Sequence, residues 1–414
     1  MTKQPAAVVE TGDQPEHPSG PAHVATVSFL ASRASPSAGF WIALAGGVAL
    51  ARTAQRRGAR WGYGAALAAM LETVALMGPA RFAVPLTQAL TAPLLGVLEA
   101  REVSLLVQVA TCALIRLVQN AAFVAFFGLV LAGGLDAYTN SYDSIAGRLS
   151  LPQGTEAALI ATGASLLTWA ILGSTVQVLV YRRGLRRWPA RLSVRAGEAA
   201  DEPSPASRRR FDPRAVVVAA AIAFVLLLSS TDWILLGTMA GWLGLAWVSA
   251  RGDRDVIPPG FVIALALAIG VFVFAAIGGS GLELALRRGT RALLLVLVAT
   301  WLRAAAGSEG LREVFRRALG RLRRVPSVPE ATVLLDQLGS VRQLVRSARS
   351  VVGAIRFVPK RPIPFLDAIL DWVVAESARF APTARASAAT LSLRAVDTAL
   401  VLFAAAPVVV LLAG

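Results

Sequence analysis

The chain has 414 residues, of which 56% are hydrophobic and 16% are charged, against about 25% charged residues in an average soluble domain. The core of a soluble protein of this size cannot bury so much apolar sequence, so the composition argues against a water-soluble enzyme. The formal net charge of +16 comes from 41 Lys and Arg against 25 Asp and Glu. Because the basic residues cluster between apolar segments, they indicate Arg-rich cytoplasmic loops of a membrane protein rather than nucleic-acid binding.

Rare residue types exclude several kinds of site. The two lysines, Lys3 and Lys360, lie outside any Gly-rich phosphate loop, so the chain has no Walker A motif of its own. Both histidines, His17 and His23, lie in a polar N-terminal segment, and Cys112 is the only cysteine. We therefore expect no metal site, no bound cofactor, no catalytic site and no intrachain disulfide.

Residues 1–37 are rich in Pro, Ala, Ser and Thr, and they lack the basic start and the apolar run of a signal peptide. This composition predicts a disordered tail. A membrane-spanning helix needs roughly 20 apolar residues, and residues 38–181 are predicted to form an N-terminal membrane unit of about five spans. The expected spans are 38–53, 61–79, 83–98, 103–134 and 155–181.

Two basic blocks orient this unit. Arginines follow the first span at 52–60 and the fifth at 182–195, and the positive-inside rule places both blocks in the cytoplasm. If residues 103–134 form one helix, the connection 136–153 lies outside. Its most polar stretch, DAYTNSYDS at 136–144, is either a solvated connection or a place that captures a solute.

Residues 182–210 carry Arg, Glu, Asp and Pro and are interpreted as a basic cytoplasmic linker. Asp212 then provides a helix N-cap, and Pro213 suits the first helical position. The arginines at 287–291 fall on the outer side, against the positive-inside rule. The apolar runs of the second half are 215–231, 233–249, 260–279, 291–306 and 395–412. The sequence thus predicts an all-α, polytopic membrane helix bundle of about ten spans.

Residues 308–380 combine charge with helical apolar spacing. In the segment around 338–356, one face carries Leu338, Val341 and Val345, and arginines recur on another face. Such helices are too charged to span a membrane and too apolar on one side to be solvated all round. We expect them to lie along the cytoplasmic membrane face or to bind a partner.

Several ionisable residues lie in or near apolar runs. Glu72, within AALAAMLETVALM, is either an intramembrane acid on an ion path or an interfacial residue. Arg116 either pairs with Glu99 or Glu102 or marks a break between two helices. Asp232 and Glu283 lie at predicted span ends, which favours an interfacial placement.

The second half resembles the transmembrane T component of energy-coupling factor transporters over about residues 211–414. The pieces that carry the resemblance follow one another in order: Asp212-Pro213 opens the first span, and Arg291 lies near the start of the span that leads into the cytoplasmic helices. The amphipathic stretch follows, and LSLRAVDTALVLFAAAP with Asp397 leads into the last span.

The functional signature of this family is a pair of Ala-Arg-Gly-like motifs. Ala348-Arg349-Ser350 resembles the first, and Ala378-Arg379-Phe380 resembles the second, with Phe380 where the family has Gly. The resemblance implies coupling helices at about 308–380 that dock into grooves on two ABC-type ATPase subunits, which hydrolyse ATP in trans. It also implies a prokaryotic cytoplasmic membrane, a vitamin or metal ion as the solute, and a substrate-binding membrane subunit, either separate or fused as residues 38–181.

A protein without a nucleotide loop that moves a solute against a gradient must receive work through a rigid contact with a partner. An Arg flanked by small residues can enter a groove and make several charge-assisted hydrogen bonds. The alternative is a non-transport membrane protein whose basic amphipathic helices bind anionic lipid or recruit a soluble partner.

Overall fold

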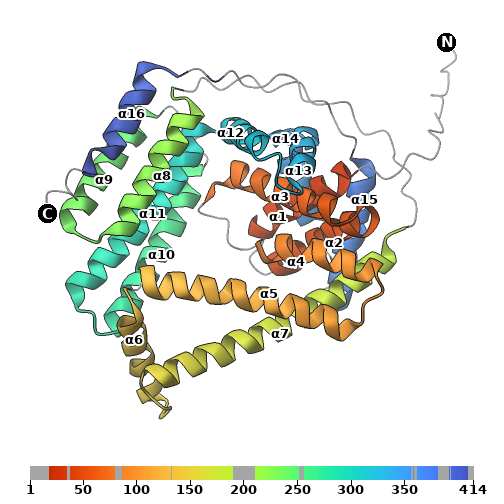
Figure 1. The fold of residues 1–414 in the computed structure, drawn as a ribbon, viewed down its shortest axis with the longest axis horizontal. Helices are drawn as coiled ribbons and strands as arrows, with labels where there is room; N and C mark the ends of the chain where they lie inside the picture. Colours follow the sequence, from red (N-terminus) through yellow and green to blue (C-terminus); the bar gives the residue numbers. More distant parts are fainter. Residues whose placement is uncertain are drawn as a thin grey trace.

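The computed structural model describes residues 18–34, 38–79, 86–131, 133–189, 210–250, 256–355, 358, 361–380, 391 and 393–408. Every regular element in these ranges is helical, which confirms the all-α class (Figure 1). The α-helices are α1 (Ser19–Ala34), α2 (Gly39–Arg57), α3 (Ala59–Met77), α4 (Leu86–Ala100), α5 (Leu105–Ala125), α6 (Leu135–Arg148), α7 (Thr155–Arg187), α8 (Pro213–Ser229), α9 (Trp233–Ser249), α10 (Ile257–Ile277), α11 (Leu282–Ala306), α12 (Ser308–Arg321), α13 (Val328–Gln337), α14 (Val341–Ile355), α15 (Pro362–Arg379) and α16 (Ala395–Ala405).

The helices pack as three parts (Figure 1). The first, which we call the mixed bundle, consists of α1–α4 and α13–α15 around one apolar core. The second, the membrane unit, consists of α8–α11 and α16 around another core. The third, the arm, consists of α5, α6 and α7. Helix α12 connects the first two parts, because Leu311 lies in the core of the membrane unit and Leu319 in that of the mixed bundle.

Helix α1 lies inside the mixed bundle and packs against α2, α3, α14 and α15. All its residues from Ser19 to Ser32 are buried, so the disordered tail expected over 1–37 is wrong for this segment. The sequence looks polar because of its Ser and Thr residues. Thr26 and Ser32, however, donate to the backbone carbonyls of Ala22 and Phe29 at 2.9 and 2.8 Å, so these hydroxyls need no partner outside the helix.

The apolar faces of the amphipathic helices find their partner in this N-terminal segment. Leu344 and Val351 of α14, and Ile369 and Val373 of α15, are buried in the same core as α1 and α2. The packing therefore differs from the expected division into units 38–181 and 211–414. Burial of these apolar stripes against another helix removes them from water as completely as a membrane surface would.

Four described helices are long and apolar enough to cross a membrane: Leu105–Gly128, α7, α10 and α11. Helices α4, α8, α9 and α16 are apolar but shorter. The structure thus has the helices of a polytopic membrane protein without confirming about ten spans. Helices α2 and α3, which cover the expected spans 38–53 and 61–79, lie in the mixed bundle.

The apolar run at 103–134 forms one helical segment, in which α5 continues into a π-helical turn at Phe126–Leu131. Gly133 and Gly134 then adopt φ values of 96° and 110°, which reverse the chain into α6. The connection 136–144 is therefore helical rather than an extended loop. The basic linker expected at 182–210 begins later, because α7 runs to Arg187; residues 190–209 lie outside the described ranges.

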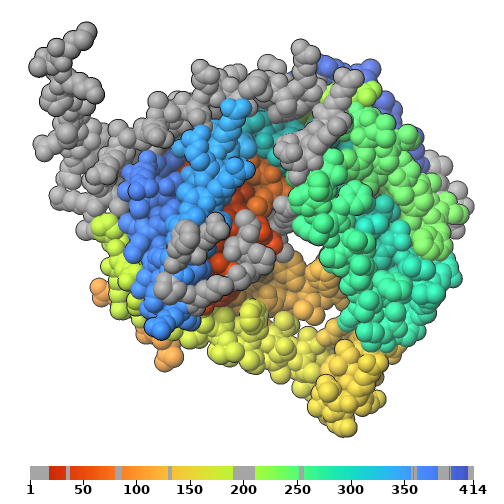
Figure 2. Space-filling model, turned by 180° about the vertical axis from the view of Figure 1, so that it is seen from behind, coloured from red at the N-terminus to blue at the C-terminus, as the bar shows by residue number. Residues whose placement is uncertain are grey.

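The arm is attached at both ends, with open space between it and the membrane unit (Figure 2). At one end, the Ser141 hydroxyl donates to the Phe274 carbonyl of α10 at 3.2 Å. At the other, Arg183 binds both carboxylate oxygens of Asp367 on α15, at 2.8 and 2.9 Å, and Arg187 reaches the same carboxylate at 3.0 Å. We call this second end, with its arginines, the basic side.

A buried ion pair ties α12 to α3. The Arg312 guanidinium binds both carboxylate oxygens of Glu72, and both side chains are almost completely buried. The same guanidinium donates to the Gly339 carbonyl at 3.0 Å and to Glu309 at 3.2 Å. Glu72 is therefore paired with an arginine of the same chain in the interior of the protein. It anchors the amphipathic segment to the N-terminal helices.

We predict that Arg312→Met destabilises the protein by about 3–5 kcal/mol, because it leaves the Glu72 carboxylate buried without its partner. The free energy of unfolding, measured by denaturant titration in detergent, tests this. Arg316→Ala on the same helix breaks only a partly exposed pair with Glu313 and should cost less than about 1 kcal/mol. The double variant Glu72→Leu/Arg312→Met should regain most of the loss. Equal losses for Arg312→Met and Arg316→Ala would contradict the assignment.

Candidate coupling site

Helices α14 and α15 form an antiparallel pair. The Ser347 hydroxyl donates to Glu376 at 2.6 Å, and the Trp372 indole donates to the Ser350 hydroxyl at 3.4 Å. These two contacts fix the register of the pair, because the residue number rises along one helix as it falls along the other. The other helices of the mixed bundle cover the inner face of the pair and leave its outer face to solvent.

The first motif lies on the exposed face of α14. Arg349 is exposed, whereas Ala348 packs against the core of the mixed bundle. Ser350 accepts the Trp372 hydrogen bond and donates to the Ser347 carbonyl at 2.8 Å. The small residues of this motif therefore allow α14 to approach α15 and the core, and the arginine projects away from both.

The second motif ends α15. Arg379 is exposed and Ala378 is half-buried. Phe380, the departure from the family pattern, is only 6% exposed, and its ring stacks on His23 of α1 with centroids 4.1 Å apart. The third position of this motif thus holds the end of α15 against α1. No sequence signal pointed to this contact, because His23 belonged to the expected tail.

The register places the two arginines on one helix pair but at different heights. Since Ser347 lies opposite Glu376, Arg379 lies level with about residue 344 of α14. Its height along the pair differs from that of Arg349 by five or six residues, or roughly 8 Å at 1.5 Å per residue. A partner that contacts both side chains must cover at least this length.

Asp212, Pro213 and Asp397 join two helices of the membrane unit at one point. The Asp212 carboxylate caps α8 by accepting from the Arg214 backbone N–H at 2.8 Å, which confirms the expected N-cap, with Pro213 at the first helical position. The Asp212 N–H donates to Asp397 at 2.7 Å, and the other Asp397 oxygen accepts from the Arg394 N–H at 2.8 Å. One carboxylate thus binds the N-termini of both α8 and α16.

The electrostatics of Asp212 suit this role. Burial disfavours its ionised form, but hydrogen bonds from the side chain and backbone of Arg214 outweigh burial and lower its pKa below the ordinary value. The carboxylate therefore stays ionised at neutral pH and keeps accepting hydrogen bonds at the start of α8.

Arg291 belongs to a different helix, α11, from Asp212, Pro213 and Asp397. Helix α11 begins at Leu282, so Arg291 is well inside this helix, buried, and in the half of the helix that is farther along the chain from α12. The arginines that were expected on the outer side have polar neighbours: Arg287 pairs with Glu283 and lies 3.7 Å from Asp232, and Arg288 donates to Ser280 at 3.0 Å. Arg287 is thus paired with carboxylates, whereas the partner of Arg288 is a neutral hydroxyl.

Arg116 pairs with neither Glu99 nor Glu102. It donates to the Gln177 side chain of α7 at 2.7 Å, and Gln177 in turn donates to Thr91 of α4 at 2.6 Å. Glu99 accepts from Arg182 at 2.9 Å instead. Arg116 therefore links α5 to α7 and does not mark a helix break.

Within the described ranges, no group of three His, Cys, Asp or Glu side chains could hold a metal ion. No protein-family model matches the chain, no curated protein matches it, and no solved structure matches its fold. The resemblance to the T component therefore rests on the residues quoted above.

His23 provides a test of how α1 packs against Phe380. Its ring is fully buried, lies 4.0 Å from Glu376, and has no hydrogen-bond partner on either nitrogen. Burial, and secondarily the nearby Arg312 charge, lower its pKa to about 3. The unfolded chain binds this proton near pH 6.5, so the contribution of His23 to stability is complete above pH 6.5 and declines as pH falls toward 3.

We predict that the free energy of unfolding falls by about 1.4 kcal/mol per pH unit below pH 6 because of this one group. His23→Phe keeps an aromatic ring against Phe380 and removes the titrating group, so the variant should be at least as stable at pH 7 and should have a flatter profile between pH 6 and 4.5. Denaturant titrations at several pH values measure this. Parallel profiles for the two proteins would contradict the buried position of His23.

Proposed function

We propose that the chain is a scaffold and coupling subunit of an ATP-driven micronutrient uptake transporter in a prokaryotic cytoplasmic membrane. In this proposal, two ABC-type ATPase subunits contact the α14–α15 pair on the basic side, which faces the cytoplasm. A substrate-binding membrane subunit contacts the chain within the bilayer. The chain has no catalytic site and receives work from ATP hydrolysed by its partners.

The proposal is supported by the different surroundings of the two faces of the α14–α15 pair. Its inner face is buried against the helices of the same chain, and its outer face presents Arg349 and Arg379 to solvent. Because the helix is already fixed, binding of its arginines requires no ordering of the backbone and costs only the freedom of the side chains. Such a surface suits docking into a protein groove.

Displacement of this pair would be transmitted along two connections. The first runs from the mixed bundle through the Glu72–Arg312 pair to α12, which follows α11 of the membrane unit. Beside it, Arg303 of α11 donates to the Leu76 carbonyl of α3 at 2.8 Å. The second runs from Asp367 of α15 to Arg183 and so to the arm. Both ion pairs are bidentate, which fixes the relative geometry of the groups that they join.

The alternative function is binding of anionic lipid or of a soluble partner. The observation that favours it is the charge of α14, which has three arginines and no acidic residue. Clusters of this kind contribute about 1 kcal/mol per basic residue at an anionic membrane surface and weaken with salt. In that case the individual arginines would contribute about equally.

Variants that replace an arginine with glutamate distinguish coupling to ATPase subunits from binding of anionic lipid. We predict that Arg349→Glu lowers capture of co-expressed ABC-type ATPase subunits by more than about 10-fold, because several charge-assisted hydrogen bonds are lost at once. Arg379→Glu should act in the same direction. The matched control is Arg323→Glu, which makes the same charge change at an exposed position outside the pair and should leave capture within about 2-fold of wild type. Pulldown from detergent, with liposome flotation in parallel, measures both functions.

Equal capture by wild type and Arg349→Glu would contradict the coupling proposal. Equal losses of liposome binding for all three variants, steeply dependent on salt, would support the lipid alternative instead.

A further inference from the structure

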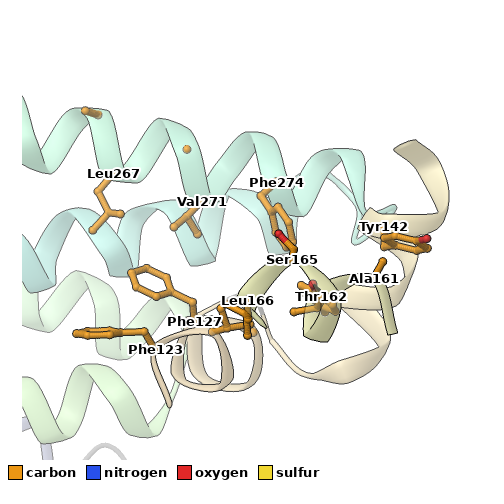
Figure 3. Close-up of a pocket in the computed structure, with 15 residues that line it drawn as sticks. Phe123, Phe127, Tyr142, Ala161, Thr162, Ser165, Leu166, Leu267, Val271 and Phe274 are labelled. Carbon is orange, nitrogen blue, oxygen red and sulfur yellow. Dashed lines mark hydrogen bonds between the residues drawn. The ribbon is translucent and has the colours of Figure 1, made fainter. Parts of the chain in front are cut away.

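A cavity of about 690 Å³ lies between α5, α6, α7 and α10, where the arm meets the membrane unit (Figure 3). Its size falls within the range of about 300–1,000 Å³ that is typical of small-molecule sites. The cavity lies at the end of the arm remote from the basic side, so it is separate from the α14–α15 pair.

The lining is uncharged and changes character along its length. None of the residues that line the cavity is Asp, Glu, Lys, Arg or His. Phe123, Phe127 and Leu267 lie toward one side, whereas Tyr142 and Thr162 lie toward the other (Figure 3). A ligand with a formal charge would lose its hydration here without gaining a partner. The chemistry therefore selects an uncharged molecule with one apolar and one polar end.

Of the hydroxyl groups that line the cavity, that of Ser165 is the one left without a hydrogen-bond acceptor among the described residues. The Thr162 hydroxyl donates to the Ala158 carbonyl at 2.7 Å, so it accepts the proton of the Tyr138 hydroxyl. The Tyr142 hydroxyl donates to the Pro152 carbonyl at 3.2 Å. Among the contacts of the described residues, the Ser165 hydroxyl makes no hydrogen bond. A ligand carbonyl or hydroxyl oxygen is the group that would accept from it.

The helices that form the walls of the cavity are fixed against one another, and the surface beside the cavity is apolar. The Tyr138 and Phe274 rings lie with centroids 6.4 Å apart, and Ser141 binds the Phe274 carbonyl, so α6 is fixed against α10. Beside the cavity, Leu167 of α7 and Ile269 of α10 are exposed, as expected of surfaces that face lipid. An apolar molecule would reach the cavity through the bilayer.

We propose that this cavity binds a small, uncharged amphiphile, with its apolar part against Phe123 and Phe127 and a carbonyl or hydroxyl oxygen at Ser165. The ligand is either a chain of a neutral membrane lipid or a smaller, single-chain amphiphile that dissolves in the bilayer. This inference goes beyond the coupling function and does not depend on it, because none of its residues belongs to the mixed bundle.

The test uses the full chain in nanodiscs with two photoactivatable probes. The first is a diazirine-labelled diacylglycerol placed in the bilayer, and the second is a diazirine-labelled dodecanol added from water. The informative variant is Gly270→Phe, because a Cβ at Gly270 meets only open space and the ring then fills the cavity without displacing the backbone. The matched control is Gly241→Phe on α9, where a Cβ also meets open space but outside the cavity.

We expect at least one probe to label peptides around Phe123 and Phe274 in wild type and in Gly241→Phe, and the labelling to fall at least 5-fold in Gly270→Phe. Ser165→Ala should weaken competition by unlabelled probe roughly 3- to 10-fold, as loss of one neutral hydrogen bond predicts. Labelling by the diacylglycerol alone identifies a two-chain bilayer lipid as the ligand, and labelling by dodecanol alone identifies a smaller, single-chain amphiphile. Absence of labelling by both probes, or equal labelling of Gly270→Phe and wild type, would overturn the proposal.

Discussion

The arrangement of the chain depends on one constraint, which is that the apolar faces of α13–α15 must be covered. Helix α1 provides much of the cover, and it can do so because it is buried on every side without leaving its hydroxyls at Thr26 and Ser32 unsatisfied. Close approach is possible at Gly46 of α2, where any side chain would collide with Ser28 of α1. Helix α1 therefore joins the N-terminal helices α2–α4 and the later helices α13–α15 into one bundle.

This constraint determines what the arginines do. Once the apolar side of α14 and α15 is buried, their basic side chains remain on the outer face, where a partner or a membrane surface can bind them. Arg312 differs because it lies on α12, where burial is compensated by Glu72, Glu309 and the Gly339 carbonyl. Arginines of similar appearance in the sequence thus have different roles: one anchors the bundle, others fasten the arm, and Arg349 and Arg379 remain available for docking.

The local features of the sequence predicted local structure well. The N-cap at Asp212 with Pro213 is correct, because capping depends on adjacent residues. The helical amphipathic stretch at 308–380 is correct for the same reason. Long-range pairing was not predictable, since hydropathy does not say which apolar face covers which. The Glu72–Arg312 pair and the Phe380–His23 stack join residues at least 240 positions apart, and the mixed bundle joins α1–α4 to helices that follow α12. Helix α1 was missed because its Ser and Thr residues resemble those of a tail until their bonds within the helix are known.

The central claim is that Ser19–Ala34 is a buried helix that holds the arginine-bearing pair in place. Hydrogen–deuterium exchange of the full chain in nanodiscs, read by mass spectrometry on peptides from this segment, tests it most directly. The account predicts that these amides are protected as strongly as those of α2 and α3, because they exchange only when the whole mixed bundle opens. Exchange within seconds at neutral pH would show that the segment is a solvated tail and that another surface covers α14 and α15.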